Sequence, residues 1–350
     1  KFKIRRVEIL KSKRSKIFIG HKVNNVLKYI KITRRYFMVE DNEIKATVSP
    51  FAIREGEIKV FDGKDGYVSM NQIIHKMNLG HINDLHFKII ELINKFEFMT
   101  SRQIFQMLEW ENVQIDSQDK LNNKLEQLVK SKILTRYYFD CKDGKGVYRI
   151  YALEKMGKYL LNSREIDCKW QPTDNTKPVA MVKKRLAGNQ VIIAYLRKVS
   201  ALDSYVPKPS FTAKMAGKVF KATGGSVKLT KNNKSVEFVF EVIRREEDWE
   251  NKLIDKMKLY KDFYENFQMG DSGYKSIPQL IIVCEDERHM AETFKTIVVN
   301  NLEISKIKLY YTTDLRQNEQ TLEKTLVEFK LDESTGKYKM EDVSVKILGI

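Results

Sequence analysis

The chain has 350 residues, of which 42% are hydrophobic and 31% are charged, and its formal net charge is +17. This length allows two or three domains, and the hydrophobic fraction is sufficient to fill ordinary cores. No run of 18 apolar residues occurs, so no membrane-spanning helix is expected.

The positive charge predicts a polyanionic partner, because such a field acts over about 8–10 Å at physiological salt. Nucleic acid is the commonest polyanion, and an anionic membrane surface is the other. A surface that is basic only for solubility is the third interpretation.

The three cysteines, Cys141, Cys168 and Cys284, form no C-x-x-C pair, and their number is odd. A disulfide framework is therefore not expected, and the reducing cytoplasm is the predicted location. No charged segment leads into an apolar one as in a secretory signal. Because the first residue is Lys1 and not Met, we expect that residues precede it.

The first 80 residues are predicted to form a small basic domain of mixed α/β structure. Residues 1–35 carry thirteen Lys or Arg residues against the single acid Glu8. Apolar residues within 26–39 have the spacing of a helix followed by a strand, so we expect a folded element rather than a disordered arm. Short strands are predicted from 36 to 68, and a short helix from 68 to 77.

A helical period begins near Asn83 and defines a second predicted domain, residues 81–162. Thr100 or Ser101 is the expected N-cap of a second helix, and Asp116 or Ser117 of a third, since their side chains accept from free backbone amides. Two strands, at 133–139 and 147–151, flank the turn residues 143–146, and a helix at 153–161 follows. Three helices followed by a hairpin is the order of a winged helix-turn-helix.

The third helix, 117–131, is the candidate DNA reader. Its leucines repeat at helical spacing, so its polar residues point outward. Lys neutralises phosphates, whereas Asn and Gln pair with adenine edges, and a basic hairpin reaches the adjacent backbone. The predicted DNA-binding residues are Ser117, Lys120, Asn123, Lys124, Gln127, Lys130, Arg136, Lys142 and Lys145. The alternative is a structural or partner-binding winged helix.

Residues 163–178 are predicted to be a linker, and 179–350 a second α/β domain. A basic block between Pro178 and Lys234 has twelve Lys or Arg residues and one acid, Asp203. Strands at 236–243, 279–284 and 307–312 alternate with helices at 249–267 and 287–300. This alternation predicts a mixed sheet covered by helices.

The segments Phe87–Leu92, Thr100–Phe105 and Leu121–Leu134, with Tyr137 and Tyr138, resemble the winged helix of the replication-relaxation family of mobile-element proteins. In that family the second half carries a glutamate-bearing strand and an amphipathic helix with a tyrosine. Phe240-Glu241-Val242 and Lys252–Lys261 match this pattern. The resemblance implies an accessory factor of plasmid replication or conjugation.

The C-terminal pattern also resembles the PD-(D/E)XK nuclease fold, whose chemistry needs an Asp and an E-x-K on adjacent strands to hold a metal and activate water. Here Glu241 is followed by Ile243 in the Lys position, and no acid lies between Lys208 and Ser235. Arg244 comes one place later and is expected on the opposite face of the strand. The sequence therefore predicts an inactive nuclease-like domain, and Glu241 is catalytic only if the nuclease alternative holds.

No other chemistry is indicated. The five histidines are scattered without ligand spacing, and no P-loop or nucleophile elbow is present. We therefore expect an α+β protein that binds double-stranded DNA in replication, transfer or transcription control of a mobile element, without cofactor or metal. A metal-dependent nuclease and a protein-interaction adaptor are the alternatives; contacts with other replication or transfer proteins and a homodimer remain open.

Overall fold

The computed structural model describes residues 49–141, 148–318, 324–332, 334 and 336–343. Of these, residues 329–340 belong to one compact unit and all others to a second unit. The predicted domain end at residue 80 and the predicted linker 163–178 both lie inside the second unit. Among the described residues, no helix is long and apolar enough to cross a membrane.

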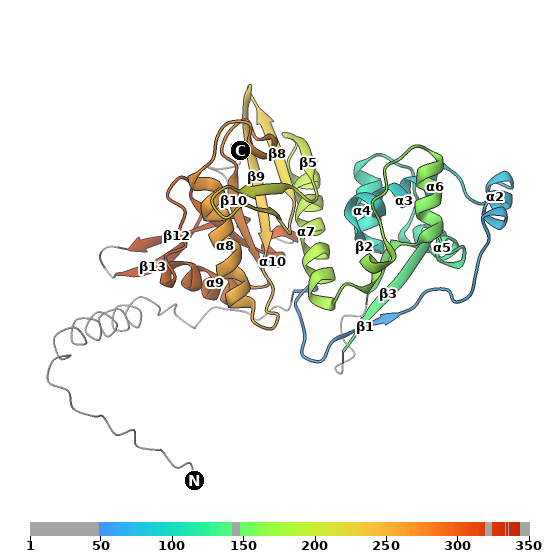
Figure 1. Cartoon of the computed structure of the whole chain (residues 1–350), viewed down its shortest axis with the longest axis horizontal. Helices are drawn as coiled ribbons and strands as arrows, with labels where there is room; N and C mark the ends of the chain where they lie inside the picture. The colour runs from blue at the N-terminus through green and yellow to red at the C-terminus, as the bar shows by residue number, and fades with distance from the viewer. Residues whose placement is uncertain (1–48, 142–147, 319–323, 333, 335, 344–350) are drawn as a thin grey trace, which may run out of the picture. The chain divides into compact units, whose positions relative to one another are not determined.

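The first half of the second unit combines helices with an antiparallel sheet (Figure 1). Its elements are β1 (Ile58–Phe61), α2 (Met70–Asn78), α3 (Asp84–Phe96), β2 (Phe98–Thr100), α4 (Ser101–Trp110), α5 (Gln118–Lys130), β3 (Leu134–Asp140), β4 (Arg149–Leu153) and α6 (Lys155–Ser163). The strands pair in the order β1-β3-β4-β2. The predicted helices and the predicted hairpin are confirmed, with ends that differ by one or two residues.

Hydrogen-bonding side chains fix where these helices begin. The Ser69 side chain accepts from Gln72 N, Thr100 from Gln103 N, and Ser117 from Lys120 N. At the first two sites the Gln side chain accepts a hydrogen bond from the backbone amide of the N-cap residue, which completes a capping box. The caps of α4 and α5 therefore agree with the sequence prediction.

The second half is a larger mixed α/β arrangement (Figure 1). Its elements are the short helix η1 (Pro172–Thr176), α7 (Val179–Lys198), β5 (Leu202–Val206), β6 (Ser210–Ala213), β7 (Lys218–Lys221), β8 (Ser226–Lys231), β9 (Lys234–Val242), α8 (Trp249–Glu265), η2 (Asp271–Gly273), β10 (Gln279–Cys284), α9 (Glu287–Val299), β11 (Leu309–Thr313) and α10 (Asp314–Asn318). The large sheet of this unit has the order β11-β10-β9-β8-β5, and β6 pairs with β7. The strands β12 (Val327–Asp332) and β13 (Lys337–Asp342) lie mainly in the other unit.

Alternate residues of β9 face different helices, as the two-residue period of a strand requires. Phe240 packs against Tyr195 of α7, with ring centroids 5.1 Å apart. Glu241 points to the other face, where it accepts a hydrogen bond from Tyr260 of α8. The strands β9, β10 and β11 run parallel, so their carboxyl ends share one edge. The predicted mixed sheet with helical connections is confirmed.

The helix α7 lies between two hydrophobic cores and was not predicted. Ile192, Ile193 and Leu196 belong to the core of the first half, whereas Leu186 and Tyr195 belong to that of the sheet. A helix that is apolar on two sides lacks the single stripe that a sequence search detects. The helix α7 therefore contributes side chains both to the core of the first half and to the core of the large sheet.

Polar contacts join α7 to the first half as well. The buried Asn189 side chain donates to the carbonyls of Phe96 and Phe98. Next to them, Glu97 forms ion pairs with Lys177, Arg185 and Lys208. Burial acts to raise the pKa of Glu97, but the three cations outweigh it and hold the pKa below its usual value.

Close packing of α7 on the sheet depends on glycine. A Cβ atom on Gly188 would lie 2.6 Å from the Thr223 carbonyl oxygen. A Cβ atom on Gly224 would lie 2.7 Å from the Cβ atom of Phe240. Only a residue without a side chain lets α7 approach the start of β8 at this distance.

Candidate functional site

The helix α5 presents a polar face over an apolar base. Leu121, Leu125 and Leu128 are completely buried. On the opposite side, Lys120, Asn123, Gln127 and Lys130 are exposed, and Lys124 is half-buried. The structure therefore brings five of the predicted DNA-binding residues together on one surface.

The side chains of this face differ in how freely they can turn to a ligand. Lys120 pairs with Asp116, and Lys130 Nζ lies 3.6 Å from a carboxylate oxygen of Glu126. These exposed pairs are weak and exchange readily for other anions. Asn123 has no hydrogen-bond partner among the residues that the structure describes. It is the amide most available for contact.

Gln127 is also engaged within the protein. Its Oε1 atom lies 3.1 Å from Nε2 of His86, a histidine that is buried. Burial lowers the pKa of His86, the bond to Gln127 raises it, and the nearby Lys124 lowers it, with a net decrease. In the neutral imidazole Nδ1 accepts from the Asn83 amide, so Nε2 donates to Gln127 Oε1, and the Gln127 amino group remains for an external acceptor.

Two of the predicted contacts take structural positions. The Ser117 hydroxyl accepts from Lys120 N at the N-terminus of α5. Arg136 is only 8% exposed and forms ion pairs with Asp62 and Glu126. Its charge is neutralised inside the protein, and it ties β3 to α5. Lys142 and Lys145 lie outside the described residues.

Six of the twelve basic residues of the second basic block form ion pairs with acids of the chain. Ion pairs form between Lys183 and Glu57, Lys184 and Glu246, Arg185 and Glu97, Lys208 and Glu97, Lys214 and Asp271, and Lys228 and Asp203. Apart from Asp203, these acids are distant in sequence. The number of Lys and Arg residues in this block is therefore larger than the number of cations available to an external partner.

Glu241 lies at the end of β9 in a closed, hydrogen-bonded environment. It is 3% exposed, and it accepts from the Thr223 hydroxyl at 3.0 Å, the Thr223 amide at 3.3 Å and the Tyr260 hydroxyl at 2.8 Å. The nearest cation is Lys256 of α8, whose Nζ lies 3.8 Å from Oε2. Among the described residues, no three His, Cys, Asp or Glu side chains cluster as metal ligands.

Neither of the two residues that directly follow β9 pairs with Glu241. Ile243 occupies the Lys position of the nuclease signature and is buried. Arg244 is completely buried and binds both carboxylate oxygens of Asp314 at 2.8 and 2.9 Å. Arg244 comes after Val242, the last residue of β9, so its expected position on the opposite strand face stays a prediction; its guanidinium pairs with Asp314 and not with Glu241. Lys256, which is the cation nearest Glu241, could not be found from the signature because it comes from a helix.

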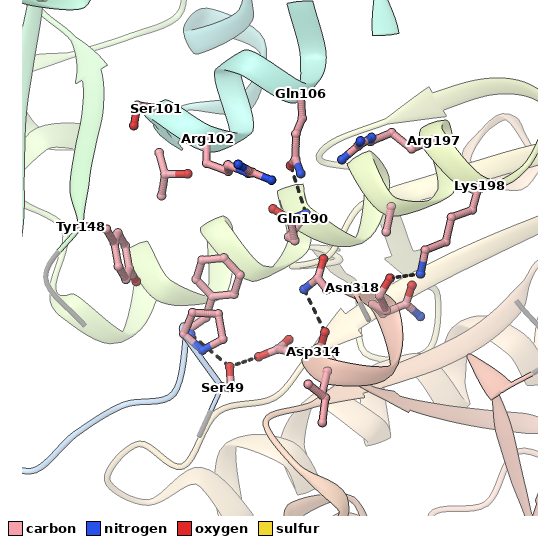
Figure 2. A pocket seen from close by; sticks show the side chains of 16 residues that line it. Ser49, Ser101, Arg102, Gln106, Tyr148, Gln190, Arg197, Lys198, Asp314 and Asn318 are labelled. Carbon is pink, nitrogen blue, oxygen red and sulfur yellow. Dashed lines mark hydrogen bonds between the residues drawn. The ribbon is translucent and has the colours of Figure 1, made fainter. Parts of the chain in front are cut away.

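A polar cavity was not anticipated from the sequence. It lies where α4, α7 and α10 meet, and Arg102 and Arg197 are among its lining residues (Figure 2). These two arginines are 95 positions apart in the chain (197 minus 102), so only the fold brings them to one place. No local spacing connects them.

Comparisons with known proteins give little further information. No protein-family model and no curated protein matches the chain. Among solved structures, it is similar to the restriction endonuclease FokI with 10% sequence identity and a TM-score of 0.25. The similarity covers 66% of this chain, and the chain spans 42% of the length of FokI. A TM-score this low does not establish that the two proteins share a fold or a function.

Proposed function

We propose that this protein binds double-stranded DNA through the exposed face of α5, which we define as Lys120, Asn123, Lys124, Gln127 and Lys130. The observation that carries the proposal is the combination on this face of three lysines with two amides, held rigidly by buried leucines. Lysines contact phosphates and amides discriminate bases. The net charge of +17 supports the same partner.

The arrangement around α5 agrees with a winged helix-turn-helix. The helices α3, α4 and α5 precede the antiparallel pair β3–β4, and the third helix of such a module enters the major groove. A protein-interaction adaptor is the alternative, but partner-binding surfaces are typically depleted of Lys and enriched in aromatic residues. The resemblance to the replication-relaxation family supports a role in the replication, transfer or transcription control of a mobile element.

The test of the proposal distinguishes side chains that recognise bases from side chains that bind phosphates. Asn123→Ala should reduce the preference for a selected DNA site over random duplex by about 1–3 kcal/mol, because one base contact is lost. It should leave the salt dependence unchanged. Lys120→Ala with Lys124→Ala should weaken both kinds of binding about equally. Fluorescence anisotropy with the two duplexes measures all of these affinities.

Asn251→Ala is the matched control, since Asn251 is an exposed amide on α8, far along the chain from α5. It should bind both duplexes as the unmodified protein does. If neither duplex is retained at about 50 mM salt, the DNA proposal is wrong. If Asn123→Ala weakens both duplexes equally, α5 holds DNA without reading it.

A metal-dependent nuclease is the second candidate, because Glu241 lies on a strand, as the glutamate of the nuclease signature does. The group facing Glu241 is the neutral hydroxyl of Thr223, not a second carboxylate, so little charge is available to hold a divalent cation. The Glu241 oxygens are also occupied by three donors.

We therefore expect no cleavage of supercoiled plasmid or linear DNA with Mg²⁺ or Mn²⁺, as followed on agarose gels. Metal-dependent nicking that disappears in Glu241→Gln and persists in Glu237→Gln would overturn this expectation. Glu237 is a suitable control because it lies on the same face of β9 but is less buried.

A further inference from the structure

The cavity where α4, α7 and α10 meet has the size of a small-molecule site. Its volume is about 880 Å³. It is lined by Ser49, Pro50, Phe51, Thr100, Ser101, Arg102, Gln106, Tyr148, Gln190, Ala194, Arg197, Lys198, Asp314, Leu315, Gln317 and Asn318. Ligand pockets are typically about 300–1,000 Å³, so this space is larger than a single inorganic ion needs.

The cavity has an excess of positive charge. Arg102 and Arg197 are exposed, and neither has an ion pair or side-chain hydrogen bond within the described part of the chain. Lys198 adds a third cation, whose Nζ donates to the Gln317 carbonyl. Six of the twelve basic residues between Pro178 and Lys234 are paired with acids, whereas Arg197 of the same block is not paired within the described residues.

The single acidic side chain of the lining cannot neutralise them. Both oxygens of Asp314 bind Arg244, and one of them also accepts from the Ser49 hydroxyl. The guanidinium ends of Arg102 and Arg197 instead point toward the amide of Gln106 (Figure 2). An anion that both guanidinium groups reach would receive planar, charge-assisted hydrogen bonds.

Neutral donors surround the same space. The first backbone amides of α4, at Ser101 and Arg102, have no acceptor within their helix, because only the Gln103 amide is capped by Thr100. The Tyr148 hydroxyl is buried, lines the cavity and has no hydrogen-bond partner among the described residues. It can therefore donate a hydrogen bond to an acceptor that enters the cavity.

From these contacts we infer that the cavity binds a phosphate ester, with Arg102 and Arg197 holding the phosphate. Phe51, Tyr148, Ala194 and Leu315 provide apolar surface for the organic part of the ligand. The shared chemistry of a free nucleotide and of a DNA backbone phosphate fits this site. The inference does not depend on DNA binding by α5, because none of the α5 side chains lines the cavity.

The test titrates the full chain with inorganic pyrophosphate and with a nucleoside triphosphate, using isothermal calorimetry at constant ionic strength. Arg102→Ala with Arg197→Ala should weaken binding by at least tenfold, because both charge-assisted contacts to the phosphate are lost. Arg102→Lys with Arg197→Lys should lose part of the affinity, since Lys cannot form the paired bonds. Arg288→Ala is the control, because it removes an exposed arginine on α9.

The outcomes distinguish the source of the phosphate. Nucleotide binding that is lost in the alanine pair and kept in Arg288→Ala supports a free phosphate ester. No nucleotide binding, together with a salt slope for duplex DNA that is flatter in the alanine pair only, supports a backbone phosphate. If both measurements are unchanged by the alanine pair, or if Arg288→Ala behaves like it, the inference is wrong. Circular dichroism of each variant verifies that the fold is retained.

Discussion

Raising the salt concentration from about 50 to 200 mM should weaken the binding of duplex DNA by about a thousandfold. Each neutralised phosphate releases condensed counterions, and about six such contacts give a slope near −5 in a plot of log K against log salt. A fourfold rise in salt then lowers the affinity by about 4 to the fifth power. The measurement is anisotropy with one duplex at five salt concentrations.

The structure indicates which cations set this slope. Six of the twelve basic residues of the block 178–234 form ion pairs with acids of the chain, which makes them less available to replace counterions. Lys120 and Lys124 face outward on α5, so changing both to Ala should flatten the slope by about one to two units. The same change at Lys183 and Lys184 would remove internal pairs and is no control for this purpose. A flat salt response of the unmodified protein would reject DNA as its partner.

Replacement of Asp314 by Ala should destabilise the protein by about 3–5 kcal/mol, because it leaves Arg244 buried without its carboxylate. Arg244 is completely buried, and its guanidinium binds Asp314 through two oxygens. The Ser49 hydroxyl loses its acceptor in the same variant. Urea unfolding, followed by tryptophan fluorescence, should show a lower midpoint.

A matched control and a double variant make this prediction specific. Asp255→Ala removes a carboxylate whose pair with Lys258 is exposed, and it should cost at most about 1 kcal/mol. Arg244→Met with Asp314→Leu removes both charges and should be more stable than Asp314→Ala alone. If Asp314→Ala unfolds at the same urea concentration as Asp255→Ala, the pair does not hold this edge of the sheet.

The sequence was informative where local chemistry decides the structure. The caps at Thr100 and Ser117 and the leucine repeat of α5 are readable because helix starts and apolar stripes depend on neighbours three or four residues away. The same reasoning placed β10 at Gln279–Cys284, where a short apolar run is buried on both faces. These elements are confirmed by the structure.

Long-range contacts explain what the sequence did not reveal. The helix α7 contains Gly188 and a run of β-branched residues, and it is apolar on two sides, so it has no helical signature. Arg136 looked available for DNA because its partners Asp62 and Glu126 lie 74 and 10 positions away. Arg102 and Arg197 likewise line the same cavity only because α4 and α7 pack together in the folded protein.

The double burial of α7 limits how this protein can be divided or recombined. Modules that bind DNA are often exchanged between proteins as independent pieces joined by flexible chain. Here a fragment that ends before Val179 would lose Ile192, Ile193 and Leu196 from the core of the first half. A division of the chain after Lys198 would instead remove Leu186 and Tyr195 from the core of the sheet. Either fragment would expose an apolar surface that water penalises. A recombination event that transfers the first half to another protein therefore has to transfer the sheet as well, so the two halves are expected to be inherited together.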